Sequence, residues 1–436
     1  MAWFNEVTFY HIYPLGAFDA PKHNTDADGN GQAQAAKSRI LQLADWIPHL
    51  KELGIGALYI GPVFESVSHG YDTTDYFTPD KRLGTKEDFR QVFSALHEAG
   101  IKIVLDGVFN HTGRLFAPYR DVVEKKDSSP YRWWFSNLNF GWGNPLGDPC
   151  TYDTWGGDWN LVKLNLSNPD VRNYLLSAVG SWIDDYDIDG LRLDTADVLH
   201  PDFIRDLNRY TKSRKSDFWL MGEFMNCANC QMMGPDLLDS ITNYECWKGM
   251  YSSVNSKNYF EISYGINRQT NPQWGMYKDK YLYNFLDNHD QPRIASQVSD
   301  KRTLKNLYTM LITMPGIPSV YYGSEWGMEG RKGHGTEADY DLRRPMTLKD
   351  MAAGDQELMK HISLLTAFRK TSKALQYGSY TNIVERNEQL LYERRFEDET
   401  VLVGFNIAEH EYTFEGRDIT LPPFESCVIR NGDRII

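Results

Sequence analysis

Three acidic residues, Asp194, Glu223 and Asp290, each follow a short apolar segment that predicts a buried strand. In the first of these segments, DIDGLRLDTADVLH (187–200), Arg192 and Asp194 occupy alternate positions. Alternate residues of a strand share one face, so the guanidinium and the carboxylate point into the same interior. Charged groups are seldom buried without a partner. We therefore expect Arg192 to hold the Asp194 carboxylate ionised and aimed at a site.

Further polar side chains stand at the ends of other apolar segments: Asp106 with Asn110 and His111, His289 beside Asp290, and His69 with Tyr71. Any one of them alone could be structural, because strand-end carboxylates often cap the following helix and single histidines often lie satisfied in a core. Their recurrence at five segment ends favours one shared site. Glycosidic bond cleavage uses several carboxyl groups in this way: one donates a proton to the leaving oxygen, and another attacks the anomeric carbon or activates water.

The elements that must position these groups alternate between apolar runs and amphipathic segments. Helical spacing is clearest in RILQLADWIPHLKELG (39–54), which closes at Gly54. Alternation of this kind predicts an α/β fold, a (β/α)8 TIM barrel whose chemistry lies at the carboxyl ends of its strands. The predicted strands cover residues 8–18, 56–63, 101–109, 188–194, 218–224, 240–245, 281–287 and 318–325.

Two stretches depart from this alternation. A long segment rich in aromatic residues, Gly and Pro follows the third strand, and it predicts an inserted subdomain that forms one wall of a cleft. The chain after residue 375 changes to short alternating strands, which indicate a C-terminal antiparallel β-sandwich domain. We expect the following division: residues 1–111 and 166–375 form the barrel, residues 112–165 the inserted subdomain, and residues 376–436 the C-terminal β domain.

Several segments resemble the signature regions of the α-amylase family of retaining glycoside hydrolases (glycoside hydrolase family 13), in the family's order and over about residues 5 to 350. The segments are DGVFNH (106–111), GLRLDTAD (190–197), GEF (222–224) and FLDNHD (285–290), extended by residues 69–89, 315–330 and DLRRPM (341–346).

The resemblance implies roles for individual side chains. Asp194 matches the nucleophile, Glu223 the general acid/base, and Asp290 the third carboxylate that binds ring hydroxyls. Asp106 and Asn110 match structural residues that tie the third strand to the insertion. The substrate-binding residues that the resemblance implies are His69, Tyr71, His111, Arg192, His289 and Arg343.

Within the family, LVKLN (161–165) and SSPYRWWF (128–135) resemble the neopullulanase and cyclomaltodextrinase branch, although that branch's N-terminal β domain has no counterpart here. Within the family, Ser68 disfavours an exo-glucosidase, and Thr195 favours specificity for α-1,4 bonds. We therefore expect a retaining hydrolase of malto-oligosaccharides, cyclodextrins or related soluble α-glucans. A 4-α-glucanotransferase would share every catalytic residue. An α-1,6-active oligosaccharide glucosidase and a non-catalytic glycan-binding relative are weaker alternatives.

A calcium loop is a second prediction. Asn24, Asp26 and Asp28 alternate before Gly29, which is the spacing of oxygen ligands in such loops. A polar surface turn without an ion carries equal weight, because the final acidic ligand is replaced by Gln32. The carboxylate chemistry itself requires no cofactor.

Composition and sequence pattern limit the kinds of partner and the location that we expect for this protein. A net charge of −13 disfavours a nucleic-acid partner. The N-terminus lacks the pattern of a signal peptide, and no apolar run is long enough to span a membrane. Five cysteines do not form a disulfide framework. We expect a cytoplasmic protein whose partner is an α-glucan oligosaccharide and whose oligomeric state stays open.

Overall fold

A computed structural model describes residues 2–24, 38–226, 229–335 and 338–436. Within them, eight parallel strands follow the order β11-β10-β9-β5-β2-β1-β13-β12. A parallel bridge between Thr242 and Tyr283 joins the two outer strands, so the sheet closes into the predicted barrel. The strands are β1 (Phe9–Ile12), β2 (Ala57–Ile60), β5 (Lys102–Gly107), β9 (Gly190–Leu193), β10 (Trp219–Gly222), β11 (Ser240–Ile241), β12 (Tyr283–Phe285) and β13 (Ile317–Tyr321).

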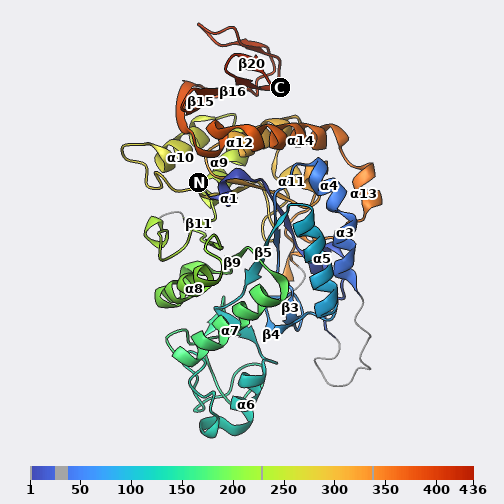
Figure 1. Ribbon diagram of the computed structural model, residues 1–436, viewed down its shortest axis with the longest axis vertical. Coiled ribbons are helices and arrows are strands. Elements are labelled where there is room, and N and C mark those ends of the chain that lie inside the picture. The colour runs from blue at the N-terminus through green and yellow to red at the C-terminus, as the bar shows by residue number, and fades with distance from the viewer. Residues whose placement is uncertain (1, 25–37, 227–228, 336–337) are drawn as a thin grey trace.

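Helices lie around the outside of this sheet (Figure 1). Their buried residues recur at the three- and four-residue spacing of an amphipathic helix, as in α5, where Phe89, Val92, Phe93 and Leu96 are buried. The main helices are α3 (Gln42–Asp45), α4 (Ile47–Glu52), α5 (Lys86–Glu98), α7 (Pro169–Tyr186), α8 (Pro201–Arg214), α9 (Tyr244–Asn255), α10 (Phe260–Thr270), α12 (Leu304–Thr313), α14 (Gln356–Thr371) and α15 (Lys373–Tyr377).

Two predicted elements have different bounds in the structure. The strand predicted over residues 8–18 ends at Ile12, because Pro14 begins a short helix, α2 (Pro14–Ala17). The helix predicted over residues 39–54 is divided into a 3-10 turn, α3 and α4. Pro48 lies in the first turn of α4, where its missing N–H cannot continue the helix from α3.

The segment after β5 contains a small sheet of its own, at the end of the molecule opposite the C-terminus (Figure 1). Its strands are β6 (His111–Gly113), β7 (Thr154–Trp155) and β8 (Asp158–Lys163), in the order β6-β8-β7, and helix α6 (Ala117–Lys125) follows β6 along the chain. A separate hairpin, β3 (Phe64–Ser66) and β4 (Thr73–Pro79), follows β2. The small sheet and the β3–β4 hairpin both lie beyond the carboxyl ends of barrel strands, and they flank the cleft described below.

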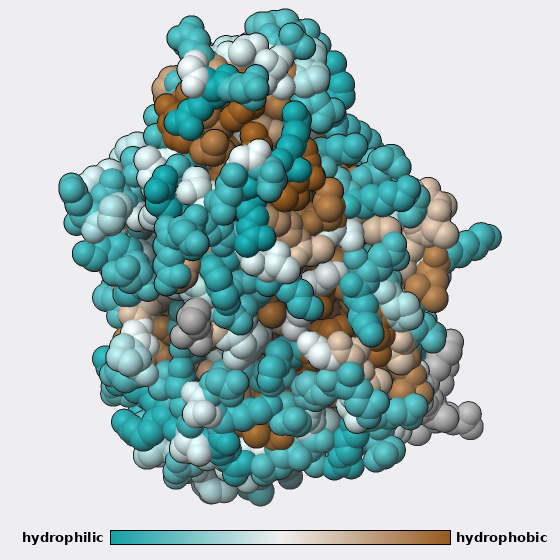
Figure 2. Space-filling model, turned by 45° about the horizontal axis from the view of Figure 1, so that its top comes forward, coloured by the Kyte–Doolittle hydropathy of each residue, from teal (hydrophilic) through white to brown (hydrophobic). Residues whose placement is uncertain are grey.

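The C-terminal segment forms the second sheet domain. The antiparallel strands β14 (Ser379–Glu385), β15 (Gln389–Phe396), β16 (Glu399–Asn406), β19 (Ser426–Arg430) and β20 (Asp433–Arg434) make one sheet, and β17 (Tyr412–Thr413) and β18 (Thr420–Leu421) make another. Hydrophobic groups are visible at the top of Figure 2, and further ones lie among hydrophilic groups lower on the same face. Leu391, Phe414, Leu421 and Cys427 form a core between the two sheets.

Candidate active site

One buried arginine joins three carboxylates at the carboxyl ends of three neighbouring strands. The strand register places Arg192 of β9 beside Asp106 of β5 and Met221 of β10. Its Nη1 lies 2.9 Å from both Asp106 Oδ1 and Asp194 Oδ1, and its Nη2 lies 2.8 Å from Glu223 Oε2. The Arg192 side chain is only 4% exposed. A single guanidinium therefore contacts three carboxyl groups in a low-dielectric interior.

Because three carboxyl groups share Arg192, the expected protonation state of Asp194 changes. Burial raises the pKa of the Asp194 carboxyl well above its ordinary value, and the nearby charges of Glu223 and Asp106 raise it further, against the lowering effect of Arg192. The sequence predicts that Arg192 holds the Asp194 carboxylate ionised, and in the structure the same guanidinium also contacts Asp106 and Glu223. We conclude that the free cluster tends to hold a proton.

Asp106 differs from its predicted structural role. It accepts hydrogen bonds from Tyr59 Oη (2.8 Å), Tyr71 Oη (3.0 Å) and Arg192, and none of these partners lies in the inserted subdomain. The side chain faces the barrel interior because inward positions alternate along β5. Asn110 does connect the third strand to the insertion, since its backbone oxygen accepts from the Leu164 N–H at 2.9 Å.

Glu223 follows β10 and lies next to the loop that follows β9. Its Oε2 accepts from the backbone N–H of Thr195 at 3.0 Å, and its Oε1 accepts from Tyr244 Oη at 3.4 Å. Thr195 has a left-handed backbone (φ 42°), which is uncommon for a β-branched residue. That strained turn directs the amide of the residue after Asp194 towards Glu223, so the two carboxyl groups are positioned by one local structure.

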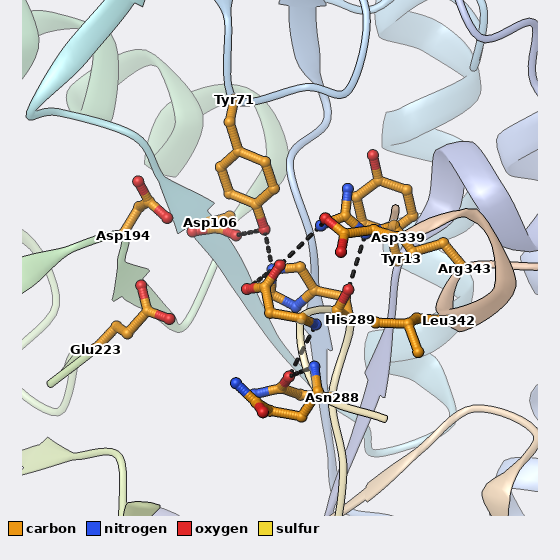
Figure 3. Close-up of polar contacts among 12 residues, drawn as sticks. Tyr13, Tyr71, Asp106, Asp194, Glu223, Asn288, His289, Asp339, Leu342 and Arg343 are labelled. Carbon is orange, nitrogen blue, oxygen red and sulfur yellow. Dashed lines mark hydrogen bonds and ion pairs between the residues drawn. The ribbon is translucent and has the colours of Figure 1, made fainter. Parts of the chain in front are cut away.

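A second cluster forms around Asp290, and its neighbours Tyr71, His289 and Arg343 are labelled in Figure 3. His289 Nε2 lies 3.0 Å from Asp290 Oδ2 and 2.5 Å from Tyr71 Oη, and Arg343 Nη2 donates to Asp290 Oδ1 at 2.7 Å. Burial raises the pKa of the Asp290 carboxyl, but His289, Arg343 and Arg192 together lower it well below the ordinary value. Asp290 is therefore ionised at neutral pH, in contrast to the Asp194 cluster.

Aromatic rings hold His289 in place. The Tyr71 ring is stacked on it with centroids 5.5 Å apart, and the Tyr13 ring is stacked at 6.0 Å. The Arg343 guanidinium lies over the Tyr13 ring, 4.8 Å from its centroid. Tyr13 also donates a hydrogen bond to the backbone oxygen of His69 at 2.6 Å. These contacts fix the orientation of Arg343 and His289 relative to the hairpin that carries Tyr71.

His111 presents one free ring nitrogen. Its Nδ1 lies 3.2 Å from Asn110 Nδ2. Its Nε2 is buried and has no partner among the described residues. Burial lowers the pKa of His111 to about 4, so the ring is neutral at neutral pH. A neutral imidazole with an unpartnered ring nitrogen can form a hydrogen bond with a ligand hydroxyl.

These groups open into one cleft of about 990 Å³. It is lined by Asp194, Glu223 and Asp290 together with the predicted binding residues His69, Tyr71, His111 and Arg343. Arg192 and His289 instead line a smaller adjoining cavity, which shares Glu223 and Tyr244 with the cleft. The predicted site residues other than the calcium ligands are thus brought together, seven on the cleft wall and two in the adjoining cavity.

Sequence reasoning missed several groups that touch this cluster. Tyr13 was included in the first predicted strand, although its place just before Pro14 was a signal that the strand had ended. Tyr244 and Asn288 support Glu223 through a chain in which Asn288 Nδ2 donates to Tyr244 Oη at 3.2 Å. Trp155 lines the cleft from the insertion. Nothing in its local sequence distinguished it from the other tryptophans.

The predicted calcium ligands are only partly described. Asp26 and Asp28 lie outside the described residues. Asn24 is buried, and its Nδ2 donates to Glu65 Oε1 at 2.7 Å and to the backbone oxygen of Ser66 at 3.2 Å. Its side-chain oxygen remains the group that a cation could use, so the calcium site stays a prediction.

A β/α barrel with clustered carboxyl groups at its carboxyl rim defines a class of enzymes whose chemistry depends on carboxylates. Comparison with known proteins places the chain within that class. Residues 23–376 match the family described as "Alpha amylase, catalytic domain". The chain therefore belongs to the α-amylase family, and it is a glycoside hydrolase.

Its relatives include the maltogenic α-amylase of Bacillus acidopullulyticus, which is 31% identical over 465 residues that cover 99% of this chain and 76% of the relative. A cyclomaltodextrinase from a Bacillus species is 31% identical and covers 93% of this chain and 73% of the relative. Among solved structures, the ligand-free cyclic α-maltosyl-(1→6)-maltose hydrolase from Arthrobacter globiformis superimposes with a TM-score of 0.85. It is 26% identical, and the match covers 99% of this chain and all of that one.

Proposed function

We propose that this enzyme hydrolyses the α-1,4-glucosidic bonds of cyclodextrins and malto-oligosaccharides and retains the anomeric configuration. The observation that carries the proposal is the pair of carboxyl groups, Asp194 and Glu223, bound to one buried arginine at the floor of the cleft. Such a pair can divide one proton between nucleophile and acid. The names of the relatives, maltogenic α-amylase and cyclomaltodextrinase, support the substrate class.

The first half of the reaction assigns a role to each carboxyl group. An Asp194 oxygen attacks the anomeric carbon while the bond from that carbon to the leaving oxygen breaks, and Glu223 gives its proton to that oxygen. Arg192 contacts both groups and stabilises the ionised form of Asp194 once the proton has moved to Glu223. Binding of substrate excludes water, which strengthens these interactions.

In the second half, Glu223 takes a proton from water while the water oxygen bonds to the anomeric carbon and the ester to Asp194 breaks. Asp290 is ionised and half-exposed in the cleft, so its carboxylate can accept hydrogen bonds from ring hydroxyls. The unpartnered Nε2 of His111 can form a hydrogen bond with the same sugar. These contacts hold the reacting ring in a distorted shape that resembles the transition state.

A cyclic tetrasaccharide is a second candidate substrate. The hydrolase of cyclic α-maltosyl-(1→6)-maltose matches this chain over nearly the full length of both, whereas the cyclomaltodextrinase match covers only part of that relative. Both substrates are closed rings of glucose, and a cleft of about 990 Å³ leaves room for a bound segment of several units.

The test is a product profile on β-cyclodextrin, maltotriose, pullulan, starch and the cyclic tetrasaccharide. We expect hydrolysis of β-cyclodextrin or maltotriose by the wild type and a loss of at least about a thousandfold in Asp194→Asn. Asp217→Asn is the matched control, because this exposed carboxylate precedes β10 at the opposite end of the strand from Glu223. An enzyme that cleaves none of these substrates, or an Asp194→Asn variant with full activity, would refute the proposal.

We further propose a cytoplasmic location and a structural calcium ion at Asn24, Asp26 and Asp28. Two Bacillus subtilis relatives are named intracellular maltogenic amylase, which supports the first proposal. Within the described residues, no helix is both long and apolar enough to cross a membrane. Cell fractionation tests the location. Dialysis against a chelator tests the ion, and it should lower the Tm in a way that added Ca²⁺ reverses.

A further inference from the structure

Glu223 follows the last residue of β10, and one residue from the neighbouring strand bonds to the backbone on both sides of it. That residue is Thr242, which is buried and directly follows β11. Its backbone N–H donates to the Gly222 oxygen at 3.1 Å. Its hydroxyl Oγ1 accepts from the Phe224 N–H at 2.8 Å and donates to the Phe224 oxygen at 3.1 Å. Thr242 therefore makes three hydrogen bonds to the two residues that flank Glu223.

The same backbone is bonded to β9 on its other side, where the Glu223 N–H donates to the Leu193 oxygen at 2.9 Å. Strand β10 ends at Gly222, and the chain becomes exposed at Met225. Where the strand ladder ends, the backbone groups of a buried residue need other partners. The Thr242 hydroxyl supplies both partners for the one buried residue that lies between Glu223 and the exposed loop.

The position of this backbone determines where the Glu223 carboxyl points. Its Oε2 accepts from Arg192 Nη2 at 2.8 Å and from the Thr195 N–H at 3.0 Å. Its Oε1 has a longer contact, 3.4 Å, with Tyr244 Oη, so Oε1 is the oxygen better placed to carry a proton to a leaving group. Proton donation requires hydrogen-bond distance to the leaving oxygen, and a displacement of about 1 Å can cost about a hundredfold in rate.

We propose that Thr242 is a positioning residue for the general acid: its hydroxyl fixes the Phe224 backbone, and through it the Glu223 carboxyl, at the distance that proton donation requires. This role rests on the proposed function, in which Glu223 is the acid. Thr242 lines the small adjoining cavity and not the cleft, so it acts through Glu223 rather than by touching the substrate. Loss of the hydroxyl should therefore slow bond cleavage only where the leaving group needs a proton.

The experiment compares two substrates that differ in their need for an acid. In maltotriose the leaving group is a sugar oxygen, which must gain a proton, whereas in α-maltosyl fluoride it is fluoride, which leaves readily without one. Thr242→Val keeps the shape of the side chain and removes the hydroxyl. In this variant, we expect kcat/KM on maltotriose to fall about tenfold or more. We expect kcat/KM on α-maltosyl fluoride to change by less than about twofold.

Further variants separate this role from general packing. Thr242→Ser keeps the hydroxyl and should retain most of the maltotriose activity. Thr211→Val is the matched control, because Thr211 is also buried and its hydroxyl donates to the Leu207 oxygen at 2.8 Å within α8. Its kcat/KM on both substrates should stay within about twofold of the wild type. If Thr242→Val does not fold, Thr242→Cys, whose thiol is a weak donor and acceptor, should show a smaller loss that is again confined to maltotriose.

Equal losses on both substrates would overturn the inference, because Thr242 would then support the fold of the site as a whole. Full maltotriose activity in Thr242→Val would overturn it as well, and so would a Thr242→Ser variant that is as impaired as Thr242→Val. A wild-type enzyme that cleaves neither maltotriose nor β-cyclodextrin would instead refute the proposed function, and the role of Thr242 with it.

Discussion

At the scale of single residues, the site depends on competition for Arg192. Asp106, Asp194 and Glu223 all contact its guanidinium, and the Asp194 side chain is only 8% exposed. Burial favours the neutral form of a carboxyl group, and like charges nearby reinforce that preference. Asp106 therefore influences the reaction without facing the substrate, because its carboxylate forms an ion pair with the same arginine as Asp194.

The basic limb of the pH–rate profile tests this competition. The reaction needs one proton shared between Asp194 and Glu223, so kcat/KM falls as the pH rises through the raised pKa at which Asp194 gives up that proton. Asp106→Asn removes one of the charges that raise this pKa, and we expect the basic limb to move to lower pH. The magnitude of kcat/KM should also fall, because Tyr71 loses a charged partner. A basic limb that stays in place or moves upward, with Asp217→Asn as control, would contradict the assignment.

Asp194 should also lower the stability of the protein at neutral pH. A free aspartate titrates near pH 3.9, and the folded pKa is higher, so the folded state binds more protons between the two values. Stability consequently falls as the pH rises through the folded pKa. We expect Asp194→Asn to have a higher Tm than the wild type at pH 7, with the difference shrinking at about pH 4. A lower Tm of the variant at pH 7 would show that Arg192 dominates instead.

At the scale of elements, the strands of the barrel were predictable, but the side-chain contacts between neighbouring strands were not. Each apolar run with a polar end predicts a strand that delivers a side chain to the rim, and the structure places Asp194, Glu223 and Asp290 there. The sharing of Arg192 depends on the register of β9 against β5 and β10, which no single segment encodes. The short helix α2 was missed because its residues are apolar enough to extend the preceding strand.

Helix α2 supports the site through close backbone contact. A Cβ atom at Gly16 would lie 1.9 Å from the backbone oxygen of Arg343, so Gly16→Ala must displace one of the two segments. We expect a loss of about 2 kcal/mol or more in the free energy of unfolding. We also expect a lower kcat/KM, because the Arg343 side chain binds Asp290.

The matched control is Gly265→Ala in α10, where the nearest atom would be 4.0 Å away. Alanine favours the helix by roughly 0.5–1 kcal/mol over glycine, so this variant should be neutral or more stable. Urea unfolding with both variants checks the prediction. Equal stability of Gly16→Ala and the wild type would contradict it.

At the scale of the whole molecule, the C-terminal sheet is bonded to the barrel through buried polar groups. Tyr392 Oη lies 2.5 Å from Thr313 Oγ1 of α12. Arg394 is fully buried and donates to the backbone oxygens of Thr313 (2.5 Å) and Gly378 (3.0 Å). Burial lowers the pKa of Arg394 to about 10, against the raising effect of nearby tyrosines such as Tyr392, so the cation is retained at neutral pH at a cost. These bonds predict that barrel and sheet unfold together.

Arg394→Met tests this coupling. The variant removes an unfavourable buried charge but leaves at least two carbonyl acceptors without partners, and the second effect should dominate. We expect a loss of about 2–4 kcal/mol within a single unfolding transition. Arg395→Met, at a neighbouring side chain that is 57% exposed, should change stability by less than about 0.5 kcal/mol. Two separate transitions in the wild type would contradict the predicted coupling.

The most direct test of the account is the anomeric form of the first product. Attack by Asp194 inverts the anomeric carbon, and attack by water on the resulting ester inverts it again, so an α-linked substrate must yield an α-anomer. Proton NMR recorded in the first minutes of β-cyclodextrin or maltotriose hydrolysis, before mutarotation, measures this directly. We predict an initial α-anomer signal at the newly formed reducing end, absent in Asp194→Asn. An initial β-anomer would mean that water attacks the sugar directly and that Asp194 is not the nucleophile.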